Sequence, residues 1–213
     1  IFHSSSLTIK KIYNKIFVGY NLRFHPLLIY LKNLINQKKD NLLSINIYSG
    51  SYLPTWRDNQ KYFKSYSAYK SRGGGVENDL SHEFDYVHWL FGGFKTTQII
   101  NKKISSLKIS SNDHLTLIGK INKNSILNIT LNYYSKIPYR KMIIDFDKKS
   151  IHLDLINNKL LIKYTKQSKI ISKHLKNFKR NLTYKKQHES ILNENYDNLC
   201  NIKDAMHYLN IIK

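Results

Sequence analysis

The sequence predicts an α+β fold, an open and mainly antiparallel β-sheet with helices packed on one face. Three observations predict it. Six short runs of alternating apolar and polar residues follow one another between residues 95 and 165. Short polar turns join several of them, as in antiparallel hairpins. Segments with helical periodicity precede and follow these runs, and such an order places helices against one face of a continuous sheet.

The chain begins with a short strand and an amphipathic helix. "KIFVGY" (15–20) is β-prone, and Pro26 suits the first turn of the helix that follows. The apolar residues of that helix recur at helical spacing, namely Leu27, Tyr30, Leu31 and Leu34. "LLSINIYSG" (42–50) then turns Leu43, Ile45 and Ile47 to one side, which predicts a strand that ends at Gly50.

Residues 51–72, "SYLPTWRDNQKYFKSYSAYKSR", form a long polar and aromatic connection without periodicity. Such connections are usually functional or disordered. The candidate ligand-binding residues here are Trp56, Arg57, Tyr62 and Tyr66. Aromatic faces and guanidinium groups suit a sugar that carries a phosphate or carboxylate. They suit unstacked bases and a phosphate backbone equally well, or they pin the loop to its own domain.

The block "SRGGGVENDLSHEFDYVHWLFGG" (71–93) differs in composition from the rest of the chain. After its three glycines, residues 78–91 predict a helix that Gly92 and Gly93 terminate. Its apolar stripe consists of Leu80, Phe84, Val87 and Phe91. A second, polar face consists of Asp79, His82, Glu83 and Tyr86, and Asp85 continues it.

This block offers an acid–base pair. Asp79 and His82 are three residues apart and share a helix face, and a carboxylate beside an imidazole raises its basicity. The glycines precede a helix N-terminus, which favours anionic groups. In the alternative interpretation, Asp79 is a helix cap, His82 a satisfied surface group and the glycines a flexible turn. A metal site with His88 is disfavoured because His82 and His88 point to different sides of the helix, so we predict no metal.

The remaining strands and the closing helix complete the predicted order. The six strand runs are 96–104, 113–121, 125–134, 139–147, 150–156 and 159–165. The last forty residues return to helical periodicity, and within them residues 189–213 carry Ala205, Leu209 and Ile212 on one face.

The composition limits the classes of function. With 35 Lys and Arg against 14 Asp and Glu, the chain of 213 residues carries a formal charge of +21. The positive charge is scattered along most of a chain in which Lys, Asn and Ile recur throughout. This distribution favours a compositional bias over a nucleic-acid interface. Cys200 is the single cysteine, so it forms no internal disulfide. No apolar run approaches the ~20 residues that span a bilayer, and we expect a cytoplasmic protein without a membrane partner.

Three ordered stretches resemble a known family. "GYNLRFHP", "SGSYLPTWR…YFKSYSAYK" and "GGGVENDLSHEFDYVHWLFGG" together are similar to the C-terminal domain of Gfo/Idh/MocA oxidoreductases. The resemblance covers nearly all of residues 16 to 213. It is strongest to members that act on nucleotide-linked or amino sugars in surface-polysaccharide pathways.

The resemblance implies a catalytic role for His82, with Asp79 as its companion, in an NAD- or NADP-dependent sugar oxidoreductase. It places Asn21 and Arg23 near the nicotinamide, and Asp85 with the substrate-binding residues. It also implies a homo-oligomer formed through the sheet face, and a sugar or nucleotide-sugar substrate.

The cofactor-binding half of the family is not found in the sequence. No G-x-G-x-x-G follows a strand, and no Glu-Lys-Pro is present. We expect residues 1–20 to be a remnant of a Rossmann domain and residues 21–213 to be the substrate domain. Without a separate Rossmann chain, the protein should neither bind NAD(P) tightly nor turn over. The alternatives are a non-catalytic sugar-binding or oligomerisation module and, third, a basic nucleic-acid-binding protein.

Overall fold

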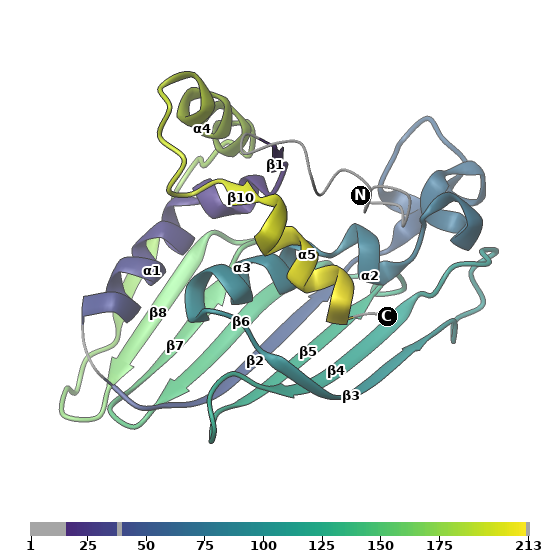
Figure 1. Ribbon diagram of the computed structural model, residues 1–213. Coiled ribbons are helices and arrows are strands. Elements are labelled where there is room, and N and C mark those ends of the chain that lie inside the picture. Colours follow the sequence, from purple (N-terminus) through teal and green to yellow (C-terminus); the bar gives the residue numbers. More distant parts are fainter. Residues whose placement is uncertain (1–15, 38–39, 212–213) are drawn as a thin grey trace.

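The computed structural model describes residues 16–37 and 40–211. Its centre is one eight-stranded sheet in the order β3-β4-β5-β2-β6-β7-β8-β9 (Figure 1). The strands are β2 (Leu42–Gly50), β3 (Lys95–Lys102), β4 (His114–Lys120), β5 (Ile126–Asn132), β6 (Tyr139–Phe146), β7 (Lys149–Asp154), β8 (Lys159–Tyr164) and β9 (Ile171–His174). Every neighbouring pair is antiparallel except β2 and β5, which are parallel. The predicted fold class is therefore confirmed.

Helices cover one face of this sheet, and the other face is open in Figure 1. They are α1 (Pro26–Gln37), α2 (Val76–Asp79), α3 (His82–Phe91), α4 (Asn181–Leu192) and α5 (Ile202–Ile211). Alternation along the strands fills the core between sheet and helices. Ile45 and Ile47 of β2 are fully buried, whereas Tyr48, the next residue along the strand, is 40% exposed.

The strand 42–50 departs from the expected pattern at one residue. Leu43, predicted to face the core with Ile45 and Ile47, is 42% exposed. The register of β2 against β6 shifts between Leu42 and Ser44, so Leu42 takes the buried position. A bulge of this kind changes which face a side chain occupies.

The predicted helix 78–91 consists of two helices. The short helix α2 ends at Asp79, and α3 starts at His82 after a break at residues 80–81. The face expected to be polar and accessible is largely internal, because Glu83 is 0% and Tyr86 is 1% exposed. Gly92 ends α3 in the left-handed conformation with φ 82°, as the sequence indicated.

The C-terminal part was predicted least well. The edge strand β9 was not expected, and residues 193–199, which lie within the predicted helical region, are not helical. The strand β10 (Cys200–Asn201) pairs with β1 (Phe17–Val18), so a segment near the start of the described chain lies beside the segment that precedes α5 (Figure 1). Ala205 is buried as predicted, whereas the Leu209 side chain, Ile212 and most of the expected remnant 1–20 lie outside the described residues.

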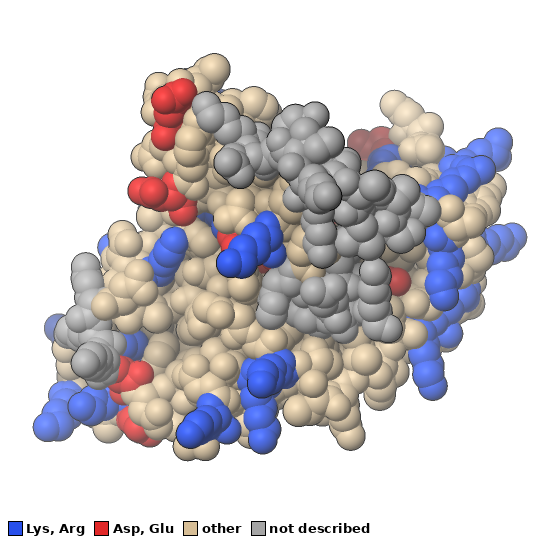
Figure 2. Space-filling view, in the orientation of Figure 1, with Lys and Arg blue, Asp and Glu red and all other residues tan. Residues whose placement is uncertain are grey.

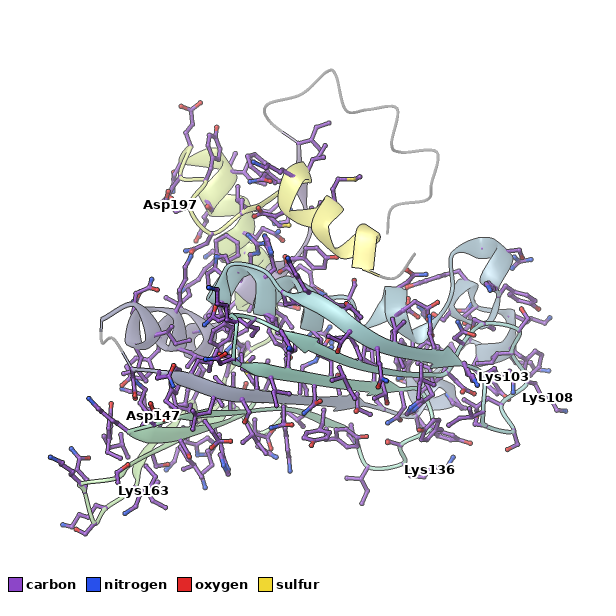
Figure 3. All side chains as sticks on the ribbon, turned by 60° about the horizontal axis from the view of Figure 1, so that its bottom comes forward. Lys103, Lys108, Lys136, Asp147, Lys163 and Asp197 are labelled. Carbon is purple, nitrogen blue, oxygen red and sulfur yellow. The ribbon has the colours of Figure 1, made fainter. Side chains whose placement is uncertain are left out.

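Charged side chains gather at no single element on the face of Figure 2, where lysine and arginine occur at both ends of the molecule. Figure 3 shows Lys103, Lys108 and Lys136 at one end of the sheet, and Asp147 and Lys163 at the other. Among the described helices, none has the length and apolar character needed to cross a membrane.

Candidate functional site

A pocket of about 360 Å³ with a mixed polar and apolar lining lies where β2 leaves the sheet. It gathers residues from β2, the long connection, both central helices, β6 and the start of α4. They are Ser49, Gly50, Ser51, Trp56, Asp79, Leu80, His82, Pro138, Tyr139, Arg140, Ile156 and Arg180. Both residues of the predicted acid–base pair line this pocket.

His82, the first residue of α3, presents a half-buried imidazole to the pocket. The Tyr20 ring packs edge-on against it, with 5.2 Å between centroids. Its Nδ1 atom is buried and has no hydrogen-bond partner among the described residues. Burial, followed by the positive charges of Arg140 and Arg180, lowers the pKa of His82 from 6.5 to about 3. The ring is therefore neutral at pH 7 and can accept a proton or hydrogen bond from a ligand.

Asp79 is held by a different partner from the one expected. The Tyr133 hydroxyl donates to Asp79 Oδ2 at 2.6 Å, and Tyr133 itself is fully buried. Asp79 also raises the pKa of the Tyr66 phenol, although burial of Tyr66 contributes more. The expectation that Asp79 raises the basicity of His82 is wrong, because burial and two arginines determine its pKa. Asp79 and His82 still face one pocket, from either side of the break between α2 and α3.

Arg140 and Arg180 were not identified from the sequence. The Arg140 Nε atom lies 2.7 Å from Glu83 Oε1, and Glu83 is fully buried. Arg140 is the second residue of β6, and Arg180 directly precedes α4. Arginine is rare in this lysine-rich sequence, which could have drawn attention to these residues. Their rarity alone, however, does not indicate which arginines lie close together in the fold.

The aromatic connection brings one of its four candidate residues to the pocket. Trp56 lines it, donates from Nε1 to Ser51 Oγ at 2.9 Å and packs edge-on against Tyr133. The Arg57 guanidinium lies 5.3 Å from the Tyr66 ring centroid, beside the pocket. The Tyr62 hydroxyl accepts a hydrogen bond from the Lys108 backbone N–H at 3.1 Å, which anchors the loop. Tyr62 therefore has the role given in the alternative interpretation, in which aromatic residues attach the loop to its own domain.

Asn21, Arg23 and Asp85 are buried, and none of them lines this pocket. Arg23 is 1% exposed, and its Nη2 atom lies 2.7 Å from Asp85 Oδ1. Arg23 also contacts Asp204 at 3.2 Å. The Asn21 amide donates to Thr183 Oγ1 at 2.6 Å. The structure therefore does not bring Asp85 to the substrate pocket, and it leaves no free polar group on Arg23 for a cofactor.

The three glycines have a packing role. A side chain at Gly74 would lie 2.3 Å from the Tyr66 carbonyl oxygen, and Gly73 has φ 76°. A side chain at Gly75 would meet the Glu77 carboxylate at 2.6 Å. The space expected to favour an anion therefore contains the chain's own carboxylate. Only glycine permits the close approach of the backbone at residue 74 to the backbone at Tyr66.

Metal-binding geometry is not found among residues 16–37 and 40–211, where no three His, Cys, Asp or Glu side chains cluster suitably. His88 lies 3.6 Å from Asp204, on the side of α3 that faces α5.

Comparisons with solved structures show the same architecture. Levoglucosan dehydrogenase in complex with NADH matches 93% of this chain and 62% of its own, with TM-score 0.77 and 14% identity. UDP-N-acetylglucosamine 3-dehydrogenase GnnA from Acidithiobacillus ferrooxidans matches 91% of this chain and 59% of its own, with TM-score 0.65 and 15% identity. A super-repressor mutant of Gal80p from Saccharomyces cerevisiae matches 90% and 54%, with TM-score 0.71 and 16% identity.

These neighbours are Gfo/Idh/MocA-type dehydrogenases and Gal80p, so the architecture expected from the resemblance is confirmed. In sequence, neither a protein-family model nor a curated protein matches the chain. The chain spans between 54% and 62% of the length of the solved structures named above. At these identities, the likeness establishes the fold alone.

Proposed function

We propose that this chain is the substrate-binding and proton-transferring part of an NAD(P)-dependent oxidoreductase that acts on a hydroxyl or keto group of a sugar or nucleotide sugar. The observation that carries the proposal is the imidazole of His82, which lines the pocket and whose Nδ1 atom has no hydrogen-bond partner among the described residues. The dehydrogenase neighbours support it, since two of them act on sugars according to their names.

The pocket residues have distinct roles in this proposal. The neutral His82 accepts the proton of a sugar hydroxyl as it is oxidised, and returns it in the reverse direction. The Asp79 carboxylate, fixed by Tyr133, accepts hydrogen bonds from neighbouring hydroxyls, and Arg140 donates them. The Trp56 ring offers a flat apolar surface for the C–H face of the sugar.

The cofactor would be held outside the described residues. Asn21 and Arg23, the proposed cofactor-binding residues, do not fit a dinucleotide here because both are 1% exposed and engaged with protein partners. NAD or NADP, when bound by a Rossmann domain, supplies the hydride acceptor or donor. We therefore infer that this chain alone is inactive. We further propose that the complete enzyme works in the cytoplasm, in surface-polysaccharide synthesis. It would do so as a homo-oligomer that is assembled through the open sheet face.

A non-catalytic binding module is the second candidate, favoured by the likeness to the super-repressor mutant of Gal80p. Such a module would bind a sugar in the pocket while its function did not depend on proton transfer. It predicts ligand affinity without turnover in any combination with a Rossmann domain. On the face seen in Figure 2, lysine and arginine side chains do not form a concentrated basic stripe, so this face gives no support to nucleic-acid binding.

The experiment combines the full chain with a Rossmann domain from a dehydrogenase of the same fold and follows nicotinamide absorbance over a panel of sugars. His82→Ala should lower the rate by ~10²-fold or more, because the proton acceptor is lost. His188→Ala, which removes an exposed histidine of α4 that does not line the pocket, should leave it unchanged. A combined enzyme whose rate is the same with and without the His82 imidazole would refute the proposed role.

A further inference from the structure

A second pocket adjoins the one that contains His82. It has a volume of about 220 Å³ and is lined by Leu22, His25, Arg140, Leu155, Ile156, Asn158, Phe178, Arg180 and Thr183. Three of these residues, Arg140, Ile156 and Arg180, also line the first pocket. The two pockets therefore meet at a boundary that carries both guanidinium groups.

The two arginines differ in their partners. The buried Glu83 carboxylate lies 2.7 Å from Arg140 and offsets its charge. Arg180 has no ion-pair partner among the described residues and is exposed. None of the described residues that line the second pocket is acidic. The carboxylates of Glu83 and Asp79 equal the two guanidinium groups in number, but neither carboxylate forms an ion pair with Arg180, whose guanidinium is therefore available to a ligand.

The backbone at Arg180 is fixed in place. The Thr183 hydroxyl donates to the Arg180 carbonyl oxygen at 2.8 Å, and it accepts the Asn21 amide at 2.6 Å. Asn21 and Thr183 are each 1% exposed. A buried chain of hydrogen bonds therefore positions the first turn of α4 and the backbone of the arginine that precedes it, so that only the Arg180 side chain has to be ordered when a ligand binds.

The second pocket is predominantly apolar beyond the guanidinium groups. Phe178 packs edge-on against His25 with 4.6 Å between centroids, and His25 Nε2 lies 3.1 Å from Asn158 Oδ1. Leu22 and Leu155 complete the wall. Burial lowers the pKa of His25, so this ring contributes little positive charge at neutral pH. The pocket suits an uncharged, partly apolar group.

We infer that Arg180, supported by Arg140, binds an anionic group of the ligand at the boundary of the two pockets. The group is a phosphate or a carboxylate, since a guanidinium donates two parallel hydrogen bonds to either. The sugar ring then lies in the first pocket beside His82, and the substituent beyond the anion lies in the second pocket. The assignment of the sugar ring rests on the proposed function, whereas the anion site itself does not.

The field at His82 is consistent with this site. The two arginines act on the imidazole in the same direction as burial, and each lowers its pKa. An anion bound at Arg180 would offset one of these charges and make the ring a stronger base when substrate is present. The same contact would thus select the ligand and prepare His82 for proton transfer.

The test is calorimetric titration of the full 213-residue chain with glucose, glucose 1-phosphate, glucuronate and inorganic phosphate. At least one anionic probe should bind more tightly than glucose, and the preferred one identifies phosphate or carboxylate. Arg180→Gln should weaken its binding about tenfold, because a charge-assisted pair of hydrogen bonds is lost. Arg180→Lys, which keeps the charge but loses the fork, should weaken it about threefold.

Lys179→Gln is the matched control. It removes one positive charge from the adjacent exposed residue, which lines neither pocket, and binding should stay within about twofold of the unmodified chain. Because Arg180 is exposed, circular dichroism should show that all three variants fold equally. Equal affinity for glucose and the anionic probes, an unaffected Arg180→Gln variant, or failure of every anion to bind at roughly millimolar concentration would each overturn the anion site.

The two proposals fail separately. Calorimetry requires neither a cofactor nor turnover, so anion binding through Arg180 with no hydride transfer in the combined enzyme would overturn the proposed function alone. Hydride transfer in the combined enzyme that depends on His82, with every anionic probe binding no more tightly than glucose, would overturn the anion site alone.

Discussion

Arg140 Nε lies 2.7 Å from Oε1 of Glu83, a carboxylate with no exposed surface. This ion pair joins β6 to α3 and turns the remaining donors of the guanidinium toward the pocket. Burial raises the pKa of Glu83, while Arg140 acts in the opposite direction and favours the ionised form. Glu83 is therefore a positioning residue, which acts on the pocket through Arg140.

Glu83→Ala should lower the free energy of unfolding by roughly 3 kcal/mol, since it leaves a cavity and removes the partner of a mostly buried arginine. Urea unfolding measures this. Glu189→Ala is a matched control, because it breaks the Lys185–Glu189 pair, whose side chains are 72% and 50% exposed. That change should remain within about 0.5 kcal/mol. Equal losses of unfolding free energy in the two variants would show that the Glu83–Arg140 pair stabilises the fold no more than the exposed Lys185–Glu189 pair does.

The Arg23–Asp85 pair predicts a structural rather than a cofactor-related phenotype. Arg23→Ala should destabilise the chain by about 3–5 kcal/mol, because the Asp85 carboxylate, whose side chain is 3% exposed, loses its main partner. The double variant Arg23→Met/Asp85→Leu should recover part of this loss, since no unpaired charge stays buried. Denaturant unfolding of Arg23→Met, Asp85→Leu and the double variant gives the coupling energy. A coupling close to zero would contradict the pairing.

The low pKa of His82 predicts a specific pH dependence. The folded-state pKa of about 3 lies below the ordinary 6.5, so the unfolded chain takes up the proton first as the pH falls. The stability that the neutral ring contributes is complete above pH 6.5 and is lost as the pH falls toward 3. The buried acids Glu83 and Asp85, whose pKa values are raised by burial, titrate with the opposite sign.

The difference between the unmodified chain and His82→Gln isolates the histidine from these acids. The unfolding free energy of the unmodified chain should fall more steeply with acid than that of the variant. A nuclear magnetic resonance titration of the His82 ring provides the direct check. A midpoint near the ordinary histidine value would contradict the environment described for this residue.

The sheet could be predicted because its signal is local. Apolar alternation in β4 to β8 and the short turns between these strands specify antiparallel hairpins without long-range information. The placement of β2 between β5 and β6 is not local, since β2 precedes β3 in the chain and pairs in parallel with β5. The edge strand β9 was missed because all of its residues are exposed and show no alternation.

The site could be predicted only where its residues are near in sequence. Asp79 and His82 were found because helical spacing links them. Arg140 and Arg180 belong to the same pocket, but they come from β6 and the start of α4 and share no spacing with the central block. Asp85 was assigned to the accessible face, yet the long-range partner Arg23, 62 residues away, accounts for its burial.

Gly74 provides the last prediction, because the space around it is occupied by backbone. A Cβ atom there would lie 2.3 Å from the Tyr66 carbonyl oxygen and 2.6 Å from that of Ser67, and neither can move as a flexible side chain would. Gly74→Ala should therefore displace the segment that leads to Asp79, with a loss of roughly 2 kcal/mol or more and weakened ligand binding.

Gly19→Ala is the matched control, since a Cβ atom at Gly19 meets nothing within 4 Å. It should be neutral or slightly stabilising, because alanine restricts the unfolded chain more than glycine does. Thermal unfolding and calorimetry of both variants test the pair. If Gly74→Ala unfolds like Gly19→Ala, the three glycines do not enforce the contact between the long connection and α2. The composition of the central block would then require an explanation other than packing.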